Sequence, residues 1–96
     1  MQKVLTISKQ SVIQQKQENI ISDMDGETVM MSIQNGKYYN LGVIGGTIWN
    51  KLIDPISFEH LIDDLISEFE IEKNECESQV ISFLELLYEE NLVVLL

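Results

Sequence analysis

Two dipeptides, Asp25-Gly26 and Asn35-Gly36, constrain the fold of this chain more than any other feature. Asp, Asn and Gly tolerate the positive φ that tight hairpin turns need, and both dipeptides lie between segments rich in strand-forming residues. The spacing predicts a three-stranded antiparallel meander over residues 19–24, 27–33 and 37–41. A sheet built from neighbouring segments is therefore the first element of the fold.

The turn at Asn35-Gly36 decides which side chains of the meander point to the core. With a three-residue loop that ends in a left-handed glycine, Ile33 pairs with Lys37 and Met31 pairs with Tyr39. That register places five side chains on the inner face: Val29, Met31, Ile33, Tyr39 and Leu41. A two-residue Asn-Gly loop would instead turn Tyr38 inward. We favour the first register because it gathers the apolar side chains on one side.

After the meander the apolar period changes from two residues to about 3.6, which is typical of helices. A short first helix is expected over residues 43–53, weakened by Gly45-Gly46 and stopped by Asp54-Pro55. Ser57 is placed to cap a second helix. The apolar stripe of this amphipathic helix is Phe58, Leu61, Ile62, Leu65, Ile66 and Phe69.

A third helix is expected to begin at Asn74, with Glu77 completing a capping box, and to run to about Glu90. The tail 92–96 is expected to form a last short strand, and Val12-Ile13 an additional one. The element order β-β-β-α-α-α, a three-stranded antiparallel meander followed by three helices, is typical of a winged-helix-like α+β domain.

The apolar side chains of the third helix fill a wide arc of about 160°. They are Cys76, Val80, Ile81, Phe83, Leu84, Leu87 and Tyr88. Either the small domain uses the whole arc to fill its core, or one shoulder (Phe83, or Ile81 with Tyr88) lines a groove for a partner. The strand 37–41 leaves a similar choice. Its outer edge either accepts another chain through unpaired N–H and C=O groups or is covered by the chain's own N-terminus or last strand.

Composition excludes several classes of function. The net charge is −10, with 16 acidic residues, 6 lysines and no arginine, which disfavours nucleic-acid binding. The length of 96 residues allows one small domain, expected to span 1–96 with 1–11 as a flexible start. No apolar run approaches the ~18 residues of a membrane span, and residues 1–11 lack the apolar core of a signal peptide. A cytoplasmic location is therefore expected.

The sequence contains few groups that could carry catalysis. His60 is the only histidine and Cys76 the only cysteine, so neither a disulfide framework nor a cysteine zinc site can form. Cys76 is flanked by Glu75 and Glu77, whose carboxylates raise the pKa of a neighbouring thiol. We therefore expect Cys76 to be a small buried apolar residue. No phosphate-binding glycine loop and no metal-ligand spacing is present. We therefore expect that the protein is not an enzyme and that it binds no cofactor or metal.

Two stretches resemble the PqqD-like family, whose members are recognition domains for ribosomally made, post-translationally modified peptides. The first is Gly36-Lys37-Tyr38-Tyr39-Asn40-Leu41, followed by Gly45 and Ile48-Trp49. The second is the helix from Val80 to Leu87, followed by Asn91-Leu92-Val93. The match covers roughly residues 20–93. The family often has Asn after the strand leucine, whereas this chain has Gly42. Glycine is a weaker N-cap than Asn, so we expect the start of the first helix to be less stable.

The chain is most similar to the stand-alone leader-binding subunit of lasso-peptide biosynthesis. This resemblance implies a non-catalytic adaptor that binds the leader segment of a precursor peptide as an added strand. It further implies delivery to a separate cysteine-protease subunit, with the ATP-dependent cyclase as another candidate partner. Carried over by motif, the docking strand is Lys37, Tyr38, Tyr39, Asn40 and Leu41. The helix wall is Val80, Phe83, Leu84, Leu87 and Tyr88. The alternative function is an acidic winged-helix module for a different protein partner or for self-association.

Overall fold

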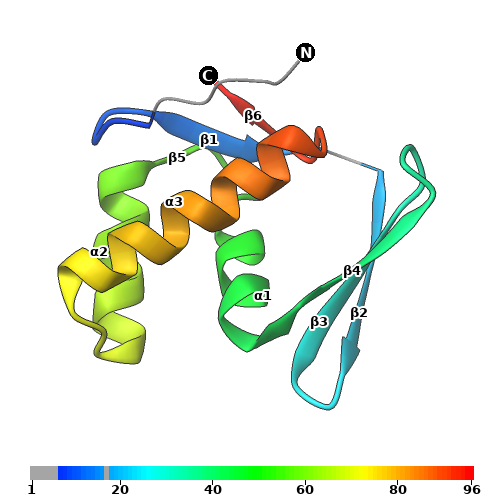
Figure 1. Ribbon diagram of the computed structural model, residues 1–96, viewed down its shortest axis with the longest axis horizontal. Coiled ribbons are helices and arrows are strands. Elements are labelled where there is room, and N and C mark those ends of the chain that lie inside the picture. The colour runs from blue at the N-terminus through cyan, green and yellow to red at the C-terminus, as the bar shows by residue number, and fades with distance from the viewer. Residues whose placement is uncertain (1–6, 17) are drawn as a thin grey trace.

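The computed structural model describes residues 7–16 and 18–96 and arranges them as two three-stranded antiparallel sheets and three helices (Figure 1). The elements are β1 (Val12–Gln15), β2 (Asn19–Met24), β3 (Glu27–Ser32), β4 (Lys37–Leu41), α1 (Gly42–Lys51), β5 (Ile56–Ser57), α2 (Phe58–Phe69), α3 (Lys73–Glu89) and β6 (Val93–Leu95). The predicted α+β class and the order of the meander and the helices are confirmed. Residues 1–6, the larger part of the segment expected to be flexible, lie outside the described residues.

The predicted meander forms one of the two sheets, in the order β2-β3-β4. Asp25 and Gly26 have φ values of 56° and 84°, and Gly36 has a φ of 66°. These positive values are the ones that a hairpin turn asks of Asp and Gly. Both dipeptides therefore lie in hairpin turns, as the sequence indicates.

The register between β3 and β4 differs from both predicted registers. Ser32 pairs with Lys37, and Met30 with Tyr39, so the loop runs from residue 33 to 36. Ser32 closes this loop, because its side-chain oxygen accepts from Asn35 N at 3.1 Å and its carbonyl accepts from Gly36 N at 2.9 Å. A longer loop anchored on a buried serine thus replaces the tight Asn-Gly turn.

This register corrects the predicted inner face. Met30 and Ser32 are 0% and 1% exposed, and they point inward with Tyr39 and Leu41. Since side chains alternate along a strand, Val29 and Met31 point to the opposite face. Ile33 lies in the loop and is 59% exposed. The prediction was right for β4 and wrong for β3.

The second sheet has the order β5-β1-β6 and brings both ends of the described chain together. The strand expected at residues 12–13 extends to Gln15, and the strand expected in the tail covers 93–95. β5 is absent from the sequence-based prediction, because two residues after a proline are too short to show an alternating pattern.

Of the predicted helix starts, that of α2 is confirmed, that of α1 moves by one residue to Gly42, and that of α3 is wrong. Ser57 caps α2 as expected, since its side-chain oxygen accepts from His60 N at 3.2 Å. The capping box predicted for α3 is wrong, because the helix begins at Lys73 with Glu72 as an N-cap that makes no side-chain bond. The backbone N–H of Cys76 already donates to the carbonyl of Glu72 at 2.9 Å, which places Asn74 inside the first turn.

The glycines around the start of α1 have structural roles that the sequence did not reveal. Gly42 has a φ of +73°, and its N–H donates to the side-chain oxygen of Asn40 at 2.9 Å. Gly46 packs so closely on Thr28 of β3 that any Cβ at this position would clash with the threonine side chain. These glycines therefore let α1 start directly after β4 and pack closely on β3.

The hydrophobic core joins β1 and β6 to all three helices and reaches Met30 of β3. Its buried members are Ile13, Met30, Ile48, Trp49, Leu52, Phe58, Leu61, Ile62, Leu65, Cys76, Val80, Leu84, Leu87, Leu92 and Val93. The meander contributes Met30 alone to this set, and Tyr39 and Leu41 pack on its boundary. Within the described residues, no helix is long and apolar enough to cross a membrane.

Candidate functional site

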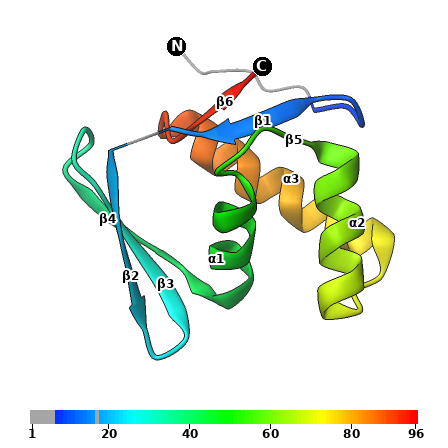
Figure 2. The same ribbon diagram turned by 180° about the vertical axis from the view of Figure 1, so that it is seen from behind.

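β4 is an edge strand beside the helical part of the molecule. Among the described residues it pairs only with β3, so its other edge carries no strand partner. β6, which the sequence left as a possible cover for this edge, pairs with β1 in the other sheet. Figures 1 and 2 show the meander standing beside the helices and joined to them through β4 and α1. Unpaired N–H and C=O groups along such an edge can accept another strand.

One flank of α3 faces this edge. A ring carbon of Phe83 lies 3.2 Å from the position that a Cβ on Gly45 would take, close to Leu41 at the end of β4. Seven residues later, Glu90 contacts Tyr39. Residues at i, i+3 and i+7 share one face of a helix. Leu86, which is 50% exposed, therefore lies between these two contact points. We call Phe83, Leu86 and Glu90 the β4-facing flank of α3.

The predicted helix-wall residues fall into three groups. Val80, Leu84 and Leu87 are 3%, 1% and 1% exposed and belong to the core. Phe83 is partly buried on the β4-facing flank. Tyr88 lines a separate depression with Lys16 and residues 93–95, toward β6. Of the predicted residues, the structure brings Phe83 next to the free edge of β4, and Val80 lines a cavity together with Phe83 and Leu41. The sequence assigned Leu86 to the acidic side of the helix and so missed it.

A small polar network holds the start of β4 against the end of α3. The Tyr39 hydroxyl donates to Glu90 Oε1 at 2.6 Å, and Lys37 Nζ lies 3.3 Å from the same oxygen. The Asn35 side-chain amide donates to the carbonyl of Glu90 at 2.7 Å and to the Tyr39 hydroxyl at 3.1 Å. We call Asn35, Lys37, Tyr39 and Glu90 the polar latch. It fixes the separation of β4 and α3 at one end.

The latch shifts the pKa values of two of its members. The hydrogen bonds from Tyr39 and then Lys37 hold the pKa of Glu90 below its usual value. Burial, followed by the hydrogen bond to Glu90, raises the pKa of Tyr39. Around neutral pH the network therefore consists of a protonated phenol and a carboxylate, which is a strong charge-assisted pair.

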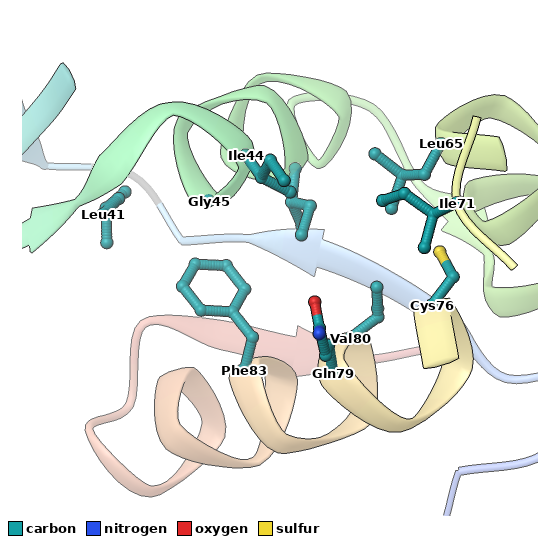
Figure 3. A pocket seen from close by; sticks show the side chains of 10 residues that line it. Leu41, Ile44, Gly45, Leu65, Ile71, Cys76, Gln79, Val80 and Phe83 are labelled. Carbon is teal, nitrogen blue, oxygen red and sulfur yellow. The ribbon is translucent and has the colours of Figure 1, made fainter. Parts of the chain in front are cut away.

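An apolar cavity of about 170 Å³ lies at the other end of β4. Its lining comes from Leu41, from all three helices, and from Ile71 in the loop between α2 and α3. Figure 3 shows the Phe83 ring and the Gln79 amide reaching from α3 toward α1 at this cavity. Pockets with apolar walls and a few polar groups are typical of ligand sites. The free edge of β4 thus runs from the polar latch to an apolar cavity.

Comparison with known proteins identifies the family of this chain. The model of a family described as coenzyme PQQ synthesis protein D (PqqD) matches residues 27–93. The chain belongs to the PqqD family. This confirms the resemblance found in the sequence. The match begins at β3 and includes β4 and α3, the two elements of the candidate site. A search of curated proteins gave no match.

Two solved structures share the fold of this PqqD-family chain. One is described as TbiB1 in complex with the TbiA(beta) leader peptide. It has a TM-score of 0.73 and 24% identity, and the alignment covers 83% of this chain and 93% of that one. The other is a lasso peptide synthetase B1 complexed with the leader peptide. It has a TM-score of 0.72 and 22% identity, with 85% and 96% covered.

The groups in this PqqD-family chain that could carry other chemistry are isolated. Cys76 is 2% exposed, and burial, followed by the charge of Glu77, raises its thiol pKa. His60 lies on the exposed side of α2, with its Nε2 3.5 Å from Asp64. Over residues 7–16 and 18–96, no group of three or more His, Cys, Asp or Glu side chains could hold a metal. The edge of β4 remains the best candidate site.

Proposed function

We propose that this PqqD-family protein is a non-catalytic, cytoplasmic adaptor for a ribosomally made precursor peptide of the lasso type. It binds the leader segment as an additional strand on β4 and delivers it to a separate cysteine-protease subunit that removes the leader. The ATP-dependent cyclase of the same pathway is a further partner. The observation that carries this proposal is the free edge of β4 facing an α3 flank that presents Phe83 and Leu86.

The meander has two edge strands, and the surroundings favour β4 over β2. β4 runs beside Phe83 and the apolar cavity, and helical spacing puts Leu86 on the same flank of α3, so a guest strand there gains side-chain contacts as well as main-chain hydrogen bonds. β2 lies at the far side of the sheet. Its inward-facing Ile21 is still 42% exposed, so the inner face at this edge is poorly covered and offers a guest strand little apolar wall. In strand addition the hydrogen bonds supply affinity and the pockets supply specificity. Among the described residues, the β4 edge offers both and the β2 edge does not.

The cavity beside Leu41 gives the guest a place for an apolar side chain. About 170 Å³ is enough to hold one apolar side chain, and Phe83 forms part of its wall. Side chains of an added strand alternate, so every second guest residue would point toward α3. We therefore expect the leader to carry an apolar residue opposite this end of β4.

Two further observations support the proposal. The solved structures of similar fold are both complexes with leader peptides. The net charge of −10 favours approach of a leader that contains Lys or Arg.

The test is a calorimetric titration with the synthetic leader of a lasso-type precursor peptide. We expect saturable one-to-one binding of the leader and none of a scrambled peptide of the same composition. Phe83→Ala should weaken binding while circular dichroism shows an unchanged fold. Equal binding of leader and scrambled peptide would overturn the adaptor function and leave a general acidic interaction module.

A further inference from the structure

The C-terminal end of α3, where the polar latch lies, has an unusual arrangement of charge. α3 has 17 residues, and no basic residue stands in its last turn. Glu89 and Glu90 instead add carboxylates at the end where the backbone carbonyls already make the helix dipole negative. Such an end attracts a cation. Lys37 at the start of β4 supplies one, with its Nζ 3.3 Å from Glu90 Oε1.

Lys37 is held weakly in this position. Its side chain is 61% exposed, and an exposed ion pair contributes little to stability. Lys37 and Tyr39 both donate to Oε1 of Glu90, and no described residue donates a hydrogen bond to Oε2. A carboxylate oxygen accepts more than one hydrogen bond. Glu90 can therefore bind a second cationic group, either beside Lys37 or in its place.

The position of Glu90 along β4 relates it to the apolar cavity. Lys37 and Leu41 lie on the same face of β4, because side chains alternate along a strand. Lys37 contacts Glu90 at one end, and Leu41 lines the cavity at the other. Four residues of strand separate them, about 13 Å. A guest strand has the same rise, so two of its residues four apart would reach Glu90 and the cavity from the same face.

We propose that Glu90 is a specificity-determining residue of the docking edge: it binds a Lys or Arg side chain of the leader, and Lys37 occupies that place in the empty protein. The inference deepens the proposed function and rests on it. The basic residue of the leader lies four residues from the apolar residue that enters the cavity. Because the guest cation displaces Lys37, removal of the Lys37 ammonium group strengthens the binding of a leader that carries this basic residue.

The test is a calorimetric titration of the full chain with matched pairs of synthetic leaders of a lasso-type precursor peptide. One leader of each pair carries a single Lys, moved through successive positions, and the other carries norleucine there, which lacks the ammonium group. Wild type is compared with Glu90→Gln and Lys37→Met.

The control variants Glu85→Gln and Lys9→Met change the net charge by the same amounts. Glu85 is exposed two residues from Phe83, on another side of α3, and Lys9 is exposed ahead of β1. Both leaders of a pair are titrated into the same variant. A weakened latch therefore changes both affinities alike and leaves their ratio unchanged.

In wild type we expect Lys to bind about threefold more tightly than norleucine at one position, four residues from the apolar residue whose replacement by Ser weakens binding most. The preference should rise to about tenfold in Lys37→Met and vanish in Glu90→Gln. Glu85→Gln and Lys9→Met should keep the wild-type ratio.

Equal affinities for Lys and norleucine at every position, or a preference that survives Glu90→Gln, would overturn the inference while saturable binding of both leaders left the proposed function intact. A preference that stays the same or falls in Lys37→Met would show that the guest does not displace Lys37, and would overturn that part of the proposal. Failure of wild type to bind either leader would instead overturn the proposed function.

Discussion

The two sheets of this molecule use the same antiparallel pairing for different purposes. In β5-β1-β6 the central strand has a partner on each side, and Ile13 and Val93 are buried in the core. In β2-β3-β4 the strands are longer, one side chain reaches the buried core, and both edges are open among the described residues. The first sheet closes the helical body. The second projects from it, and its two outer strand edges have no strand partner among the described residues.

This difference predicts where backbone hydrogen bonds can be removed without unfolding the protein. A central strand uses the N–H groups of both parities, whereas an edge strand uses one and leaves the other free. The predictions that follow test this contrast, beginning with the largest effect.

Proline substitution at each position from 37 to 40 is expected to separate binding from folding. Proline removes one N–H and fixes φ near −65°. At one parity, either 37 and 39 or 38 and 40, the variant should fold but lose leader binding altogether. At the other parity it should lose a bond to β3 and unfold. Circular dichroism and calorimetric titration measure the two effects.

Gln15→Pro in β1 is the comparison for that scan. The N–H of Gln15 donates to the carbonyl of Leu52 at 2.8 Å, inside the first sheet's contact with the helices. We expect this variant to unfold. A stable Gln15→Pro protein, or four folded β4 variants that all bind the leader at full strength, would contradict the contrast between the sheets.

The two flanks of α3 are expected to differ in the same way. Phe83→Ala and Leu86→Ala should each weaken leader binding by more than about 1 kcal/mol, because both side chains face the β4 edge. Leu86 is half exposed, so its truncation should change the free energy of unfolding little. Tyr88→Ala, on the β6 side, is the control and should leave affinity unchanged. Thermal unfolding of each variant separates binding from stability. Weaker binding in Tyr88→Ala than in Leu86→Ala would reverse the assignment of the flanks.

The contrast between the sheets also explains which features could be predicted from the sequence. Turn dipeptides and strong helical stripes are local signals, so the meander, α2 and the Ser57 cap were predictable. The β3 register was not, because it depends on Ser32, Asn35 and the distant Glu90.

Among the residues of the candidate site, Leu86 was missed for a similar reason. Helical periodicity gives the angle of a side chain around the helix and not the position of a strand beside it. The direction of the flank became clear only through the contacts of Phe83 with α1 and of Glu90 with Tyr39. Gly42 and Gly46 also depended on backbone φ and on Thr28 of another element.

A smaller effect is expected from the polar latch. Tyr39→Phe removes the hydroxyl that donates to Glu90 and accepts from Asn35, so β4 is held less firmly and leader binding should weaken a few-fold. Asn50→Ala is the control, an exposed polar residue on α1. Unchanged affinity in Tyr39→Phe would show that the latch does not position the docking edge.

The latch also predicts a pH dependence. Folding lowers the pKa of Glu90, so its contribution is present above the ordinary carboxyl pKa and is lost as the pH falls through the lowered value. Folding raises the pKa of Tyr39, so that contribution is present below the ordinary phenol pKa and is lost as the pH rises through the raised one. Stability should therefore fall more steeply with acid in wild type than in Glu90→Gln. Identical acid profiles in denaturant titrations would contradict this.

The smallest expected effect concerns salt. With a net charge of −10, the protein should associate with a basic leader more slowly as salt is raised. The equilibrium affinity should change less, because main-chain hydrogen bonds and apolar contacts carry most of it. Stopped-flow association at several salt concentrations measures this. An on-rate that stays constant would show that charge does not steer the leader.

Amide hydrogen exchange followed by nuclear magnetic resonance, with and without the leader, tests the central claim most directly. If the leader adds to β4, the two amides of one parity between residues 37 and 40 should slow strongly when it binds. The other parity, already paired with β3, should change little, and the outer edge of β2 should not change. Slowed exchange along β2, or no change in β4 at saturating leader, would contradict strand addition at β4.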